Sequence, residues 1–316
     1  MKPSVAIIGA GVSGLTCAVM LAERGFRTRI FAEEIGERTT SAAAGAIWFP
    51  YDAGPADAVS AWAFDTYHVL FDLSDKKGTG VSMIELRSFA RVGEISIPKW
   101  ALPLGALVMS SEAETSVTGF SSGFTMTVPL MDTPMYLDYL AARVTNAGGS
   151  ITGGIRFENL ADVDRDYDLV VNCAGIGARM LVPDSELESH RGQIVVVPKF
   201  DLSFAVVCDD PPLMYAFPRS GDCVLGGTND LGDDLAPRTP QTISILAECS
   251  RVLKIDPPKV FSERVGLRPF RKSGVRLERE QLPDNRTVIH NYGHGGSGFT
   301  LSWGCAKAVL ALATDH

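Results

Sequence analysis

The segment SVAIIGAGVSGLTCAVMLAERGFRTRIFAE, residues 4–33, decides the fold. Its apolar run over 5–8 predicts a strand, its glycine-rich run over 9–14 predicts a tight turn, and the amphipathic stretch that ends at Arg24 predicts a helix. A second strand is predicted over 28–32. Strand, turn, helix and strand in this order are typical of a unit that binds a dinucleotide.

The glycines and the acid of this segment each have a physical task. Gly9 permits the tight turn, Gly11 lets a pyrophosphate approach the backbone, and Gly14 lets the helix pack closely on the strand. The helix N-terminus adds free N–H donors and the positive end of a dipole. An ordinary glycine-rich turn is the alternative, and the motif does not choose between NAD and FAD. The predicted contacts in this unit are Gly9, Gly11, Val12, Ser13, Gly14 and Glu33, of which Glu33 would bind the adenosine ribose.

Composition limits the class of protein and of partner. With 316 residues, 46% of them hydrophobic and 21% charged, the chain is an ordinary globular protein with room for one large or two interleaved domains. A net charge of −8 and a pI near 5.2 disfavour nucleic-acid and anionic-membrane partners. A homodimer is one of the oligomeric states that the sequence allows.

Cysteines, histidines and the termini suggest the compartment. The six cysteines are far apart and form no CxxC pair, so we expect buried free thiols rather than disulfides or a metal site. His290 and His294 lack a metal-spaced partner, and no metal is predicted. We find no secretory leader, no apolar run of about 20 residues and no organelle-targeting terminus. A reducing cytoplasm is therefore expected.

The rest of the chain alternates helix-like and strand-like segments. A strand over 168–172 runs into the small-residue turn CAGIGA at 173–178, which predicts a returning strand of the nucleotide-binding sheet. We therefore predict a nucleotide-binding domain over 1–50, 136–182 and 285–316, and a second domain over 51–135 and 183–284. The remaining predicted elements are helices over 51–73, 135–146 and 240–253, and strands within 73–129, 193–198 and 214–227.

Two side chains outside the nucleotide unit are candidates for binding an anion. Arg268 lies in the predicted Pro-terminated turn 266–269, where its guanidinium could form two hydrogen bonds to a carboxylate; an ion pair with Glu263 or Glu278 is the alternative. Tyr215 begins a predicted strand and is either a core residue or a hydroxyl donor to a substrate carboxylate.

A second glycine-rich motif, HNYGHGGSGFTLSWGCA, covers 290–306. Four glycines within six residues precede a small-residue helix, and so form a second backbone cradle and a second helix N-terminus. Such a helix end could hold negative charge near N1 and O2 of a reduced flavin, with Thr300 near that ring edge. The hydroxyl-rich stretch 39–41 suits phosphate or ring contact, and a solvated loop with a helix N-cap is its alternative.

Together these motifs resemble the D-amino-acid oxidase family of FAD enzymes, and the resemblance covers nearly the whole chain. GAGVSGL, TTSAAAGAIWFPY, DLVVNCAGIGA, HRGQIVVV, VGLRPFRKSGVRLERE and the C-terminal motif occur in the family's order. The resemblance implies a mixed α/β fold, with a discontinuous Rossmann-like FAD-binding domain and a substrate-binding domain on a mixed or antiparallel sheet. It also implies noncovalent FAD held by the first unit together with Thr39, Thr40, Ser41, Gly45, Ala46, Ile47, Gly175, Gly293, Gly295, Ser297, Gly298, Phe299 and Thr300.

The same resemblance implies a reaction. Arg268 and Tyr215 would bind the carboxylate of a D-amino acid, and the carbonyl of Gly296 would accept a hydrogen bond from its amino group. Hydride would pass from Cα to flavin N5, and oxygen would reoxidise the flavin, giving a 2-oxo acid, ammonia and hydrogen peroxide. The alternatives are a D-aspartate oxidase or related amine-oxidising flavoenzyme, a noncatalytic FAD-binding redox sensor and, more weakly, an NAD-dependent dehydrogenase.

Three departures from the family pattern bear on the substrate. Phe49 stands where mammalian members carry a glutamine, Asn229 stands where D-aspartate oxidases carry an arginine, and the lid segment 210–215 is short and lacks a second tyrosine. These features favour neutral or apolar D-amino acids over acidic ones. Arg219 and Arg271 are the other cations that could reach an acidic side chain.

Overall fold

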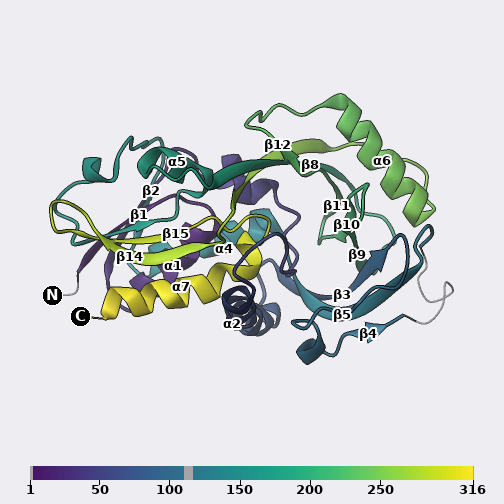
Figure 1. The fold of residues 1–316 in the computed structure, drawn as a ribbon, viewed down its shortest axis with the longest axis horizontal. Coiled ribbons are helices and arrows are strands. Elements are labelled where there is room, and N and C mark those ends of the chain that lie inside the picture. Colours follow the sequence, from purple (N-terminus) through teal and green to yellow (C-terminus); the bar gives the residue numbers. More distant parts are fainter. Residues whose placement is uncertain (1–2, 110–116, 316) are drawn as a thin grey trace.

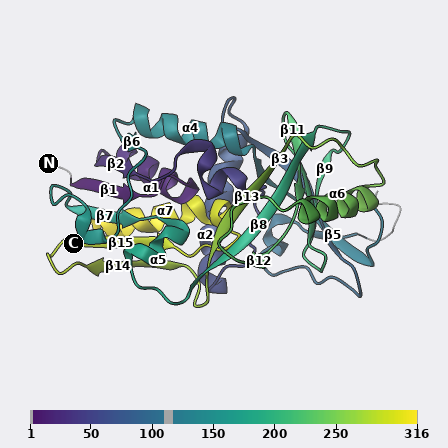
Figure 2. The ribbon, with the colours of Figure 1, turned by 90° about the horizontal axis from the view of Figure 1, so that it is seen from above.

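The computed structural model describes residues 3–109 and 117–315. Within them, two β-sheets lie side by side along an elongated molecule, and both ends of the chain lie next to the first sheet (Figure 1). Viewed from above, the long strands β8 (Leu187–Pro198) and β13 (Ser262–Arg271) cross the middle of the molecule between the two halves (Figure 2). The chain enters the first sheet three times, as the sequence predicts.

The first sheet is the predicted nucleotide-binding sheet. In the described residues it has the order β14-β15-β7-β1-β2-β6, and every neighbouring pair is parallel except β14 and β15. All five residues of β1 are buried because helices cover the sheet, which explains the continuous apolar run. Its strands are β1 (Ser4–Ile8), β2 (Arg27–Phe31), β6 (Ser150–Thr152), β7 (Leu169–Asn172), β14 (Arg276–Gln281) and β15 (Thr287–Tyr292).

Helices α1 (Val12–Glu23) and α7 (Gly298–Thr314) pack on one another beside this sheet, and α2 (Ala56–Ser74) packs on α7. The α2–α7 contact is close because a Cβ on Gly304 would lie 2.2 Å from the carbonyl oxygen of Trp62. The other helices are α4 (Thr133–Asn146), α5 (Ala178–Leu181) and α6 (Thr239–Leu253), with 3-10 turns at Gly36–Arg38, Thr40–Ala43, Leu102–Leu104, Leu160–Asp162 and Gly175–Gly177.

The second sheet has nine strands among the described residues, and the path β12-β8-β11-β10-β9-β3-β5-β4 contains one parallel pair, β3 with β9. A separate apolar core lies between this sheet and α6, which covers its outer face (Figure 1). Besides β8 and β13, its strands are β3 (Val81–Ala90), β4 (Leu107–Val108), β5 (Ser122–Met131), β9 (Phe204–Cys208), β10 (Met214–Pro218), β11 (Asp222–Gly226) and β12 (Asp230–Leu231).

Three details differ from the expectations. Arg268 lies in β13 rather than in a turn, opposite His190 of β8. Pro269 fits because no full strand pairs with the other edge of β13 among the described residues: that edge has an isolated bridge between Phe270 and His294, and there the Pro269 carbonyl accepts from the N–H of Gly295. The segment 214–227 forms two antiparallel strands, β10 and β11, because Ser220 and Gly221 turn the chain between them. Strand β14 joins the first sheet, although the sequence groups 183–284 with the second domain. The exact domain boundaries stay a prediction.

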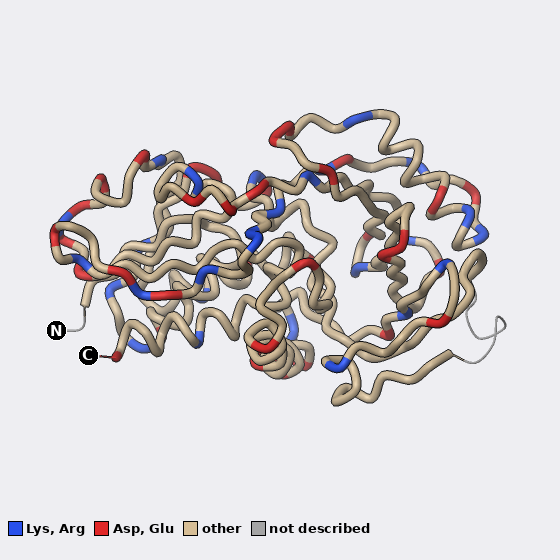
Figure 3. Tube along the Cα trace, viewed as in Figure 1, with Lys and Arg blue, Asp and Glu red and all other residues tan. Residues whose placement is uncertain are grey.

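Charged residues of both signs are scattered along the trace in both halves of the molecule (Figure 3). Among the described residues, no helix has both the length and the apolar character needed to cross a bilayer.

Candidate active site

A cavity of about 610 Å³ lies where the two sheets meet. On one side it is lined by the residues that follow the carboxyl ends of β1, β2 and β7, the usual ligand position of a parallel sheet. On the other side it is lined by the inner face of the second sheet, including β8, β10 and β13. One cavity therefore contacts both glycine-rich motifs and the candidate anion-binding side chains.

Two glycines of the N-terminal turn, Gly9 and Gly14, are packed too tightly against backbone for a side chain. Gly9 has φ +108°, and a Cβ there would lie 2.4 Å from the carbonyl oxygen of Cys173. A Cβ on Gly14 would lie 1.9 Å from the carbonyl oxygen of Gly9, so this glycine sets the distance between α1 and β1. Gly9 and Gly11 line the cavity, whereas Gly14 lies behind it as a packing residue.

The hydroxyl-rich segment beside the turn provides a cap, as considered from the sequence, and its contact with the cofactor stays a prediction. The Thr39 side chain caps the following 3-10 turn by accepting a hydrogen bond from the N–H of Ala42, and it also lines the cavity. Ser41 Oγ accepts a hydrogen bond from the N–H of Val12 at 2.9 Å. The other cavity-lining residues predicted to contact the cofactor in this region are Val12, Ser13, Glu33, Thr40, Gly45, Ala46, Ile47 and Gly175.

The C-terminal motif forms the floor between the two ends of the cavity. A Cβ on Gly295, which has φ +53°, would lie 2.1 Å from the carbonyl oxygen of Asp52, and a Cβ on Gly296 would lie 2.4 Å from the Tyr51 ring. Both glycines line the cavity, and Gly296 is exposed to it. Gly298 and Phe299, at the start of α7, also line the cavity.

Three predicted cofactor contacts of this motif do not line the cavity. The Thr300 hydroxyl accepts from the N–H of Phe49 at 3.1 Å and donates to its carbonyl at 3.0 Å. Ser297 Oγ likewise accepts from the N–H of Tyr51 at 2.7 Å and donates to its carbonyl. Gly293 lies against Arg271. The two hydroxyls therefore fasten the 49–51 segment to α7, and a contact with the flavin would have to come from their backbone.

Arg268 and Tyr215 come from separate strands and meet at the far end of the cavity. Nη1 of Arg268 donates to the carbonyl of Thr228 at 2.8 Å and to Oδ1 of Asn229 at 3.2 Å. Burial raises the pKa of the Tyr215 phenol, and the nearby Arg268 partly offsets that shift, so Tyr215 stays a neutral donor. No carboxylate of the described residues pairs with Arg268, whereas the other arginines that line the cavity, Arg38, Arg156 and Arg179, pair with Glu34, Glu33 and Asp233.

Glycines give both side chains their room. A Cβ on Gly192 of β8 would lie 2.4 Å from Nη1 of Arg268. A Cβ on Gly226 would lie 2.0 Å from Cζ of Tyr215, and one on Gly227 would lie 2.6 Å from its hydroxyl. The guanidinium and the phenol therefore lie directly over bare backbone, which restricts where they can move.

The alternatives considered for Arg268 are excluded by the positions of its supposed partners. Glu263 is bonded to Thr242, and Glu278 is paired with Arg276 at 2.6 Å. Neither acid contacts Arg268 among the described ion pairs. The guanidinium is therefore available to an anion in the cavity.

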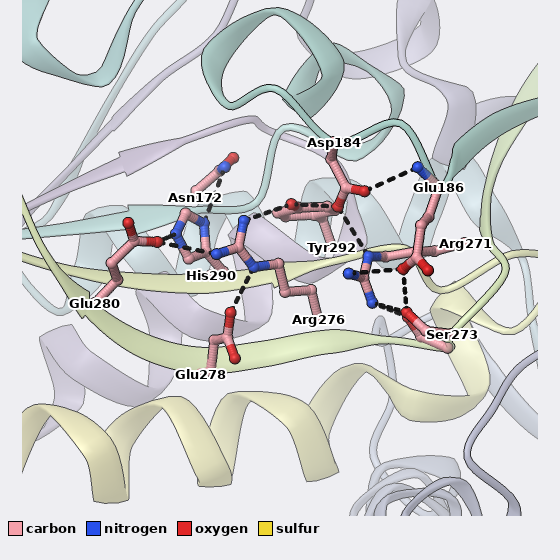
Figure 4. Close-up of polar contacts among 11 residues, drawn as sticks. Asn172, Asp184, Glu186, Arg271, Ser273, Arg276, Glu278, Glu280, His290 and Tyr292 are labelled. Carbon is pink, nitrogen blue, oxygen red and sulfur yellow. Dashed lines mark hydrogen bonds and ion pairs between the residues drawn. The ribbon is translucent and has the colours of Figure 1, made fainter.

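Arg219 and Arg271 are not available for a side-chain carboxylate, which corrects the expectation that they could reach one. Arg219 is 4% exposed and donates to both carboxylate oxygens of Asp222 at 2.7 Å. Arg271 pairs with Asp184 at 2.8 Å and with Glu186 at 3.0 Å, in the polar network of Figure 4. Both arginines are neutralised by acids outside the residues that line the cavity.

The same network contains His290, one of the two histidines of the C-terminal motif. His290 is fully buried, lies 3.3 Å from Nδ2 of Asn172 and lies 3.0 Å from Oε2 of Glu280 (Figure 4). His294 lines the cavity and contacts Oδ1 of Asn291 at 3.0 Å; burial lowers its pKa to about 4. The described residues contain no cluster of side chains that could hold a metal ion. All six cysteines are buried free thiols, as the sequence predicts.

Two cavity residues were not singled out by sequence reasoning. Tyr51 lines the cavity, and its hydroxyl accepts a hydrogen bond from Nδ2 of Asn229 at 3.2 Å, which links it through Asn229 to Arg268. Asp209 lines the cavity directly after β9. Neither residue lies in a recognisable motif, so the sequence alone does not mark either of them. The alternation of side chains along β9, continued to the residue that follows it, is the one signal for Asp209.

Comparison with known proteins identifies the family. The sequence model of the FAD dependent oxidoreductase family matches residues 4–312. The chain belongs to this FAD-dependent oxidoreductase family. It is 40% identical to a D-amino-acid oxidase of Rubrobacter xylanophilus, over 97% of this chain and 94% of that protein, and 30% identical to a human D-aspartate oxidase, over 98% and 94%.

The family fold is equally clear. A crystal structure of glycine oxidase from Geobacillus kaustophilus superposes with a TM-score of 0.83, covering 99% of this chain and 95% of that one, at 19% identity. The cavity fits the family's cofactor: helices α1 and α7 begin beside it with no acid in their first turns, and glycine backbone lines it at Gly9, Gly11, Gly295 and Gly296. FAD is therefore the cofactor of this oxidoreductase.

Proposed function

We propose that this oxidoreductase is a D-amino-acid oxidase that deaminates neutral or apolar D-amino acids. The observation that carries the proposal is Arg268, a cavity-lining guanidinium that no described carboxylate pairs with, beside the phenol of Tyr215. A partly buried cation without a counter-ion favours an anionic ligand. Relatives named D-amino-acid oxidase, at 40% identity over nearly the full length, support an amino acid as that ligand.

We propose that the FAD is held noncovalently, with its adenosine half against Gly9–Gly14 and Glu33, and its ring near Gly45–Ile47, Gly175 and the start of α7. Apart from the Glu33 carboxylate, these residues supply backbone donors and close contacts rather than charged side chains. When bound, FAD would supply the two-electron redox chemistry of the reaction, in which the amino acid is oxidised and oxygen is reduced to hydrogen peroxide. We do not require Ser297 and Thr300 to contact it through their hydroxyls.

The protein's own task is orientation. Arg268 would bind both oxygens of the substrate carboxylate, and Tyr215 would donate to one of them. The carbonyl of Gly296, which is exposed to the cavity, would accept from the amino group. The carboxylate at Arg268, the amino group at Gly296 and the side chain in the remaining pocket would be three different points of contact, which define one hand of the substrate and direct one Cα–H toward the ring. The product imine would hydrolyse to a 2-oxo acid and ammonia after release.

The side-chain wall supports a preference against acidic substrates. Asn229 is bonded to both Arg268 and Tyr51, and Arg219 and Arg271 are occupied by acids away from the cavity. Phe49 lines the cavity and packs edge-on against Trp100 at 5.3 Å. No second cation therefore faces a substrate carboxylate among the described residues at this end. This wall makes D-aspartate oxidase the less favoured activity.

A reducing cytoplasm is our proposed location, because six buried free thiols suit such a compartment. The function is tested by purifying the protein, recording its visible spectrum and screening paired D- and L-amino acids for peroxide. We expect a yellow protein that releases peroxide from neutral D-amino acids and not from their L-enantiomers. A flavin-loaded protein that releases no peroxide from any D-amino acid would favour a noncatalytic sensor and overturn the proposal.

A further inference from the structure

We propose that Asp209 extends the substrate range to D-amino acids with a cationic side chain, such as D-lysine, by pairing with the side-chain ammonium. This inference rests on the proposed function and names a substrate class for the same site. Asp209 lines the cavity that also contains Arg268 and Tyr215. The α-carboxylate of the substrate would then pair with the guanidinium of Arg268, and its side-chain ammonium would pair with the carboxylate of Asp209.

Strand alternation directs the Asp209 side chain to the cavity. Val207 of β9 lines the cavity and pairs with Tyr215 of β10, which also lines it. Residues two positions apart share a face of a sheet, so Asp209 continues the face of Val207 just as Leu213 and Phe217 continue that of Tyr215. All five side chains line the cavity.

The position along the strands fits the length of a lysine side chain. Phe217 lies toward the proposed ring-binding region, because a Cβ on Gly45 would lie 2.6 Å from its ring. Asp209 lies at the opposite end of this row, two residues beyond the Val207–Tyr215 pair, which is about 7 Å along a strand. A four-carbon side chain extending from a carboxylate held at Tyr215 and Arg268 spans a similar length.

Asp209 also lies close to the carboxylate clamp on the side of Tyr51. Both Asp209 and Arg268 shift the pKa of the Tyr51 phenol, in opposite directions, on top of the larger rise caused by burial. Tyr51 is therefore within electrostatic reach of the anion and of the cation. Since Asn229 bridges Tyr51 and Arg268, the two charges face one continuous pocket rather than separate surfaces.

The carboxylate of Asp209 has no hydrogen-bond or ion-pair partner among the described residues, in contrast to that of Asp210, which accepts from the backbone N–H of Arg91 at 2.8 Å. The groups that act on Asp209 raise its pKa to about 6, first through burial and then through the charges of Asp210 and Asp52. An ammonium group would supply the missing partner and offset the repulsion from the two acids.

The test compares matched ligands that differ by one ammonium group. D-Lysine is compared with D-norleucine as substrate at pH 8, and 6-aminohexanoate is compared with hexanoate as a nonreacting competitor of the same length. In Asp209→Asn we expect the lysine-to-norleucine ratio of kcat/KM to fall about tenfold, and the inhibition constant of 6-aminohexanoate to rise relative to that of hexanoate by a similar factor. Asp209→Glu, which keeps the charge, should retain most of the preference.

The neighbouring Asp210→Asn is the control for general charge, because Asp210 does not line the cavity. Its lysine-to-norleucine ratio should stay within about twofold of the parent ratio, given that an exposed charge at this distance is screened. An unchanged lysine-to-norleucine ratio of kcat/KM in Asp209→Asn, or an equal fall of that ratio in Asp210→Asn, would overturn this inference. If D-norleucine is still oxidised in that case, the proposed function stands. Absence of oxidation of any D-amino acid overturns both.

Discussion

At the Gly9 end of the cavity a ligand faces backbone, whereas at the Arg268 end it faces side chains. The first end is made by glycines whose neighbours leave no room for a Cβ, with helix N-termini behind them. The second is made by Arg268, Tyr215, Tyr51 and Asp209, which come from distant parts of the chain. We therefore expect substitution of Gly9 or Gly14 at the cofactor end to be poorly tolerated, and single side-chain replacements at the substrate end to change specificity.

The largest effect is expected for Gly14→Ala. Its Cβ would lie 1.9 Å from the backbone oxygen of Gly9, and backbone cannot move aside as a flexible side chain does. We expect bound FAD to fall more than tenfold and the melting temperature to drop by several degrees, measured by absorbance of the purified protein and by calorimetry. Gly221→Ala is the control, because nothing lies within 4 Å of its added Cβ. Full FAD content in Gly14→Ala would show that the close packing of this glycine is not needed for cofactor binding.

Arg268→Ala should weaken substrate binding at one end of the cavity while leaving FAD binding at the other end intact. Loss of charge-assisted bonds worth about 1.5–3 kcal/mol predicts a fall of about 10- to 150-fold in kcat/KM for D-norleucine, with KM rising and FAD retained. Steady-state kinetics and the flavin spectrum measure the two readouts. Arg279→Ala, an exposed arginine on β14, is the matched control and should leave kcat/KM unchanged. An unaltered KM in Arg268→Ala would move the substrate carboxylate elsewhere.

A smaller effect of the same kind is expected for Gly192→Ala, which adds no charge and removes none. Its Cβ would lie 2.4 Å from Nη1 of Arg268, so the end of that flexible side chain must move. We expect kcat/KM for D-norleucine to fall about tenfold while FAD binding is kept. Gly221→Ala again serves as the control. Unchanged kcat/KM would mean that the Arg268 guanidinium can move away from its contacts with Thr228 and Asn229 without weakening substrate binding.

The smallest effect concerns stability and pH. The folded-state pKa of Asp209 is raised from 3.8 to about 6, so between those values the folded protein holds a proton that the unfolded chain has lost. Stability contributed by this group therefore falls as pH rises from about 4 to 6 and is constant above. Because Asp209 is exposed to the cavity, screening limits the gain of Asp209→Asn at pH 8 to about 1–2 °C in melting temperature, with no gain at pH 4. Equal gains at both pH values would contradict this origin.

Local sequence determined most of the cofactor end. The segment over 4–33 forms the predicted strand, turn, helix and strand, because each step depends on glycine geometry and on apolar periodicity within a few residues. Gly295 and Gly296 of the C-terminal motif line the cavity, but their close contacts are with Asp52 and Tyr51, which lie far away in sequence. The hydroxyls of Ser297 and Thr300 could not be assigned in this way, since their partners, the backbones of Tyr51 and Phe49, lie about 250 residues away.

The substrate end was only partly predictable. The family resemblance pointed to Arg268 and Tyr215, but the sequence assigned Arg268 to a turn and left Arg219 and Arg271 as further candidates. The pairing of β13 with β8 places Arg268 in a strand. Ion pairs with Asp222 and Asp184 occupy Arg219 and Arg271. The positions of Tyr51 and Asp209 in the cavity could not be predicted from the sequence, because they depend on which residues lie across the cavity in the folded chain.

From the sequence alone, the strand, turn, helix and strand over 4–33 indicate a dinucleotide-binding unit, because apolar periodicity and glycine geometry act over a few residues. Only the tertiary structure decided which charges face the substrate: it leaves Arg268 without a carboxylate partner, neutralises Arg219 and Arg271, and turns Asp209 into the cavity. The physical reason is that a charge acts on whatever lies within a few ångströms of it, and strand pairing rather than sequence proximity fixes those neighbours.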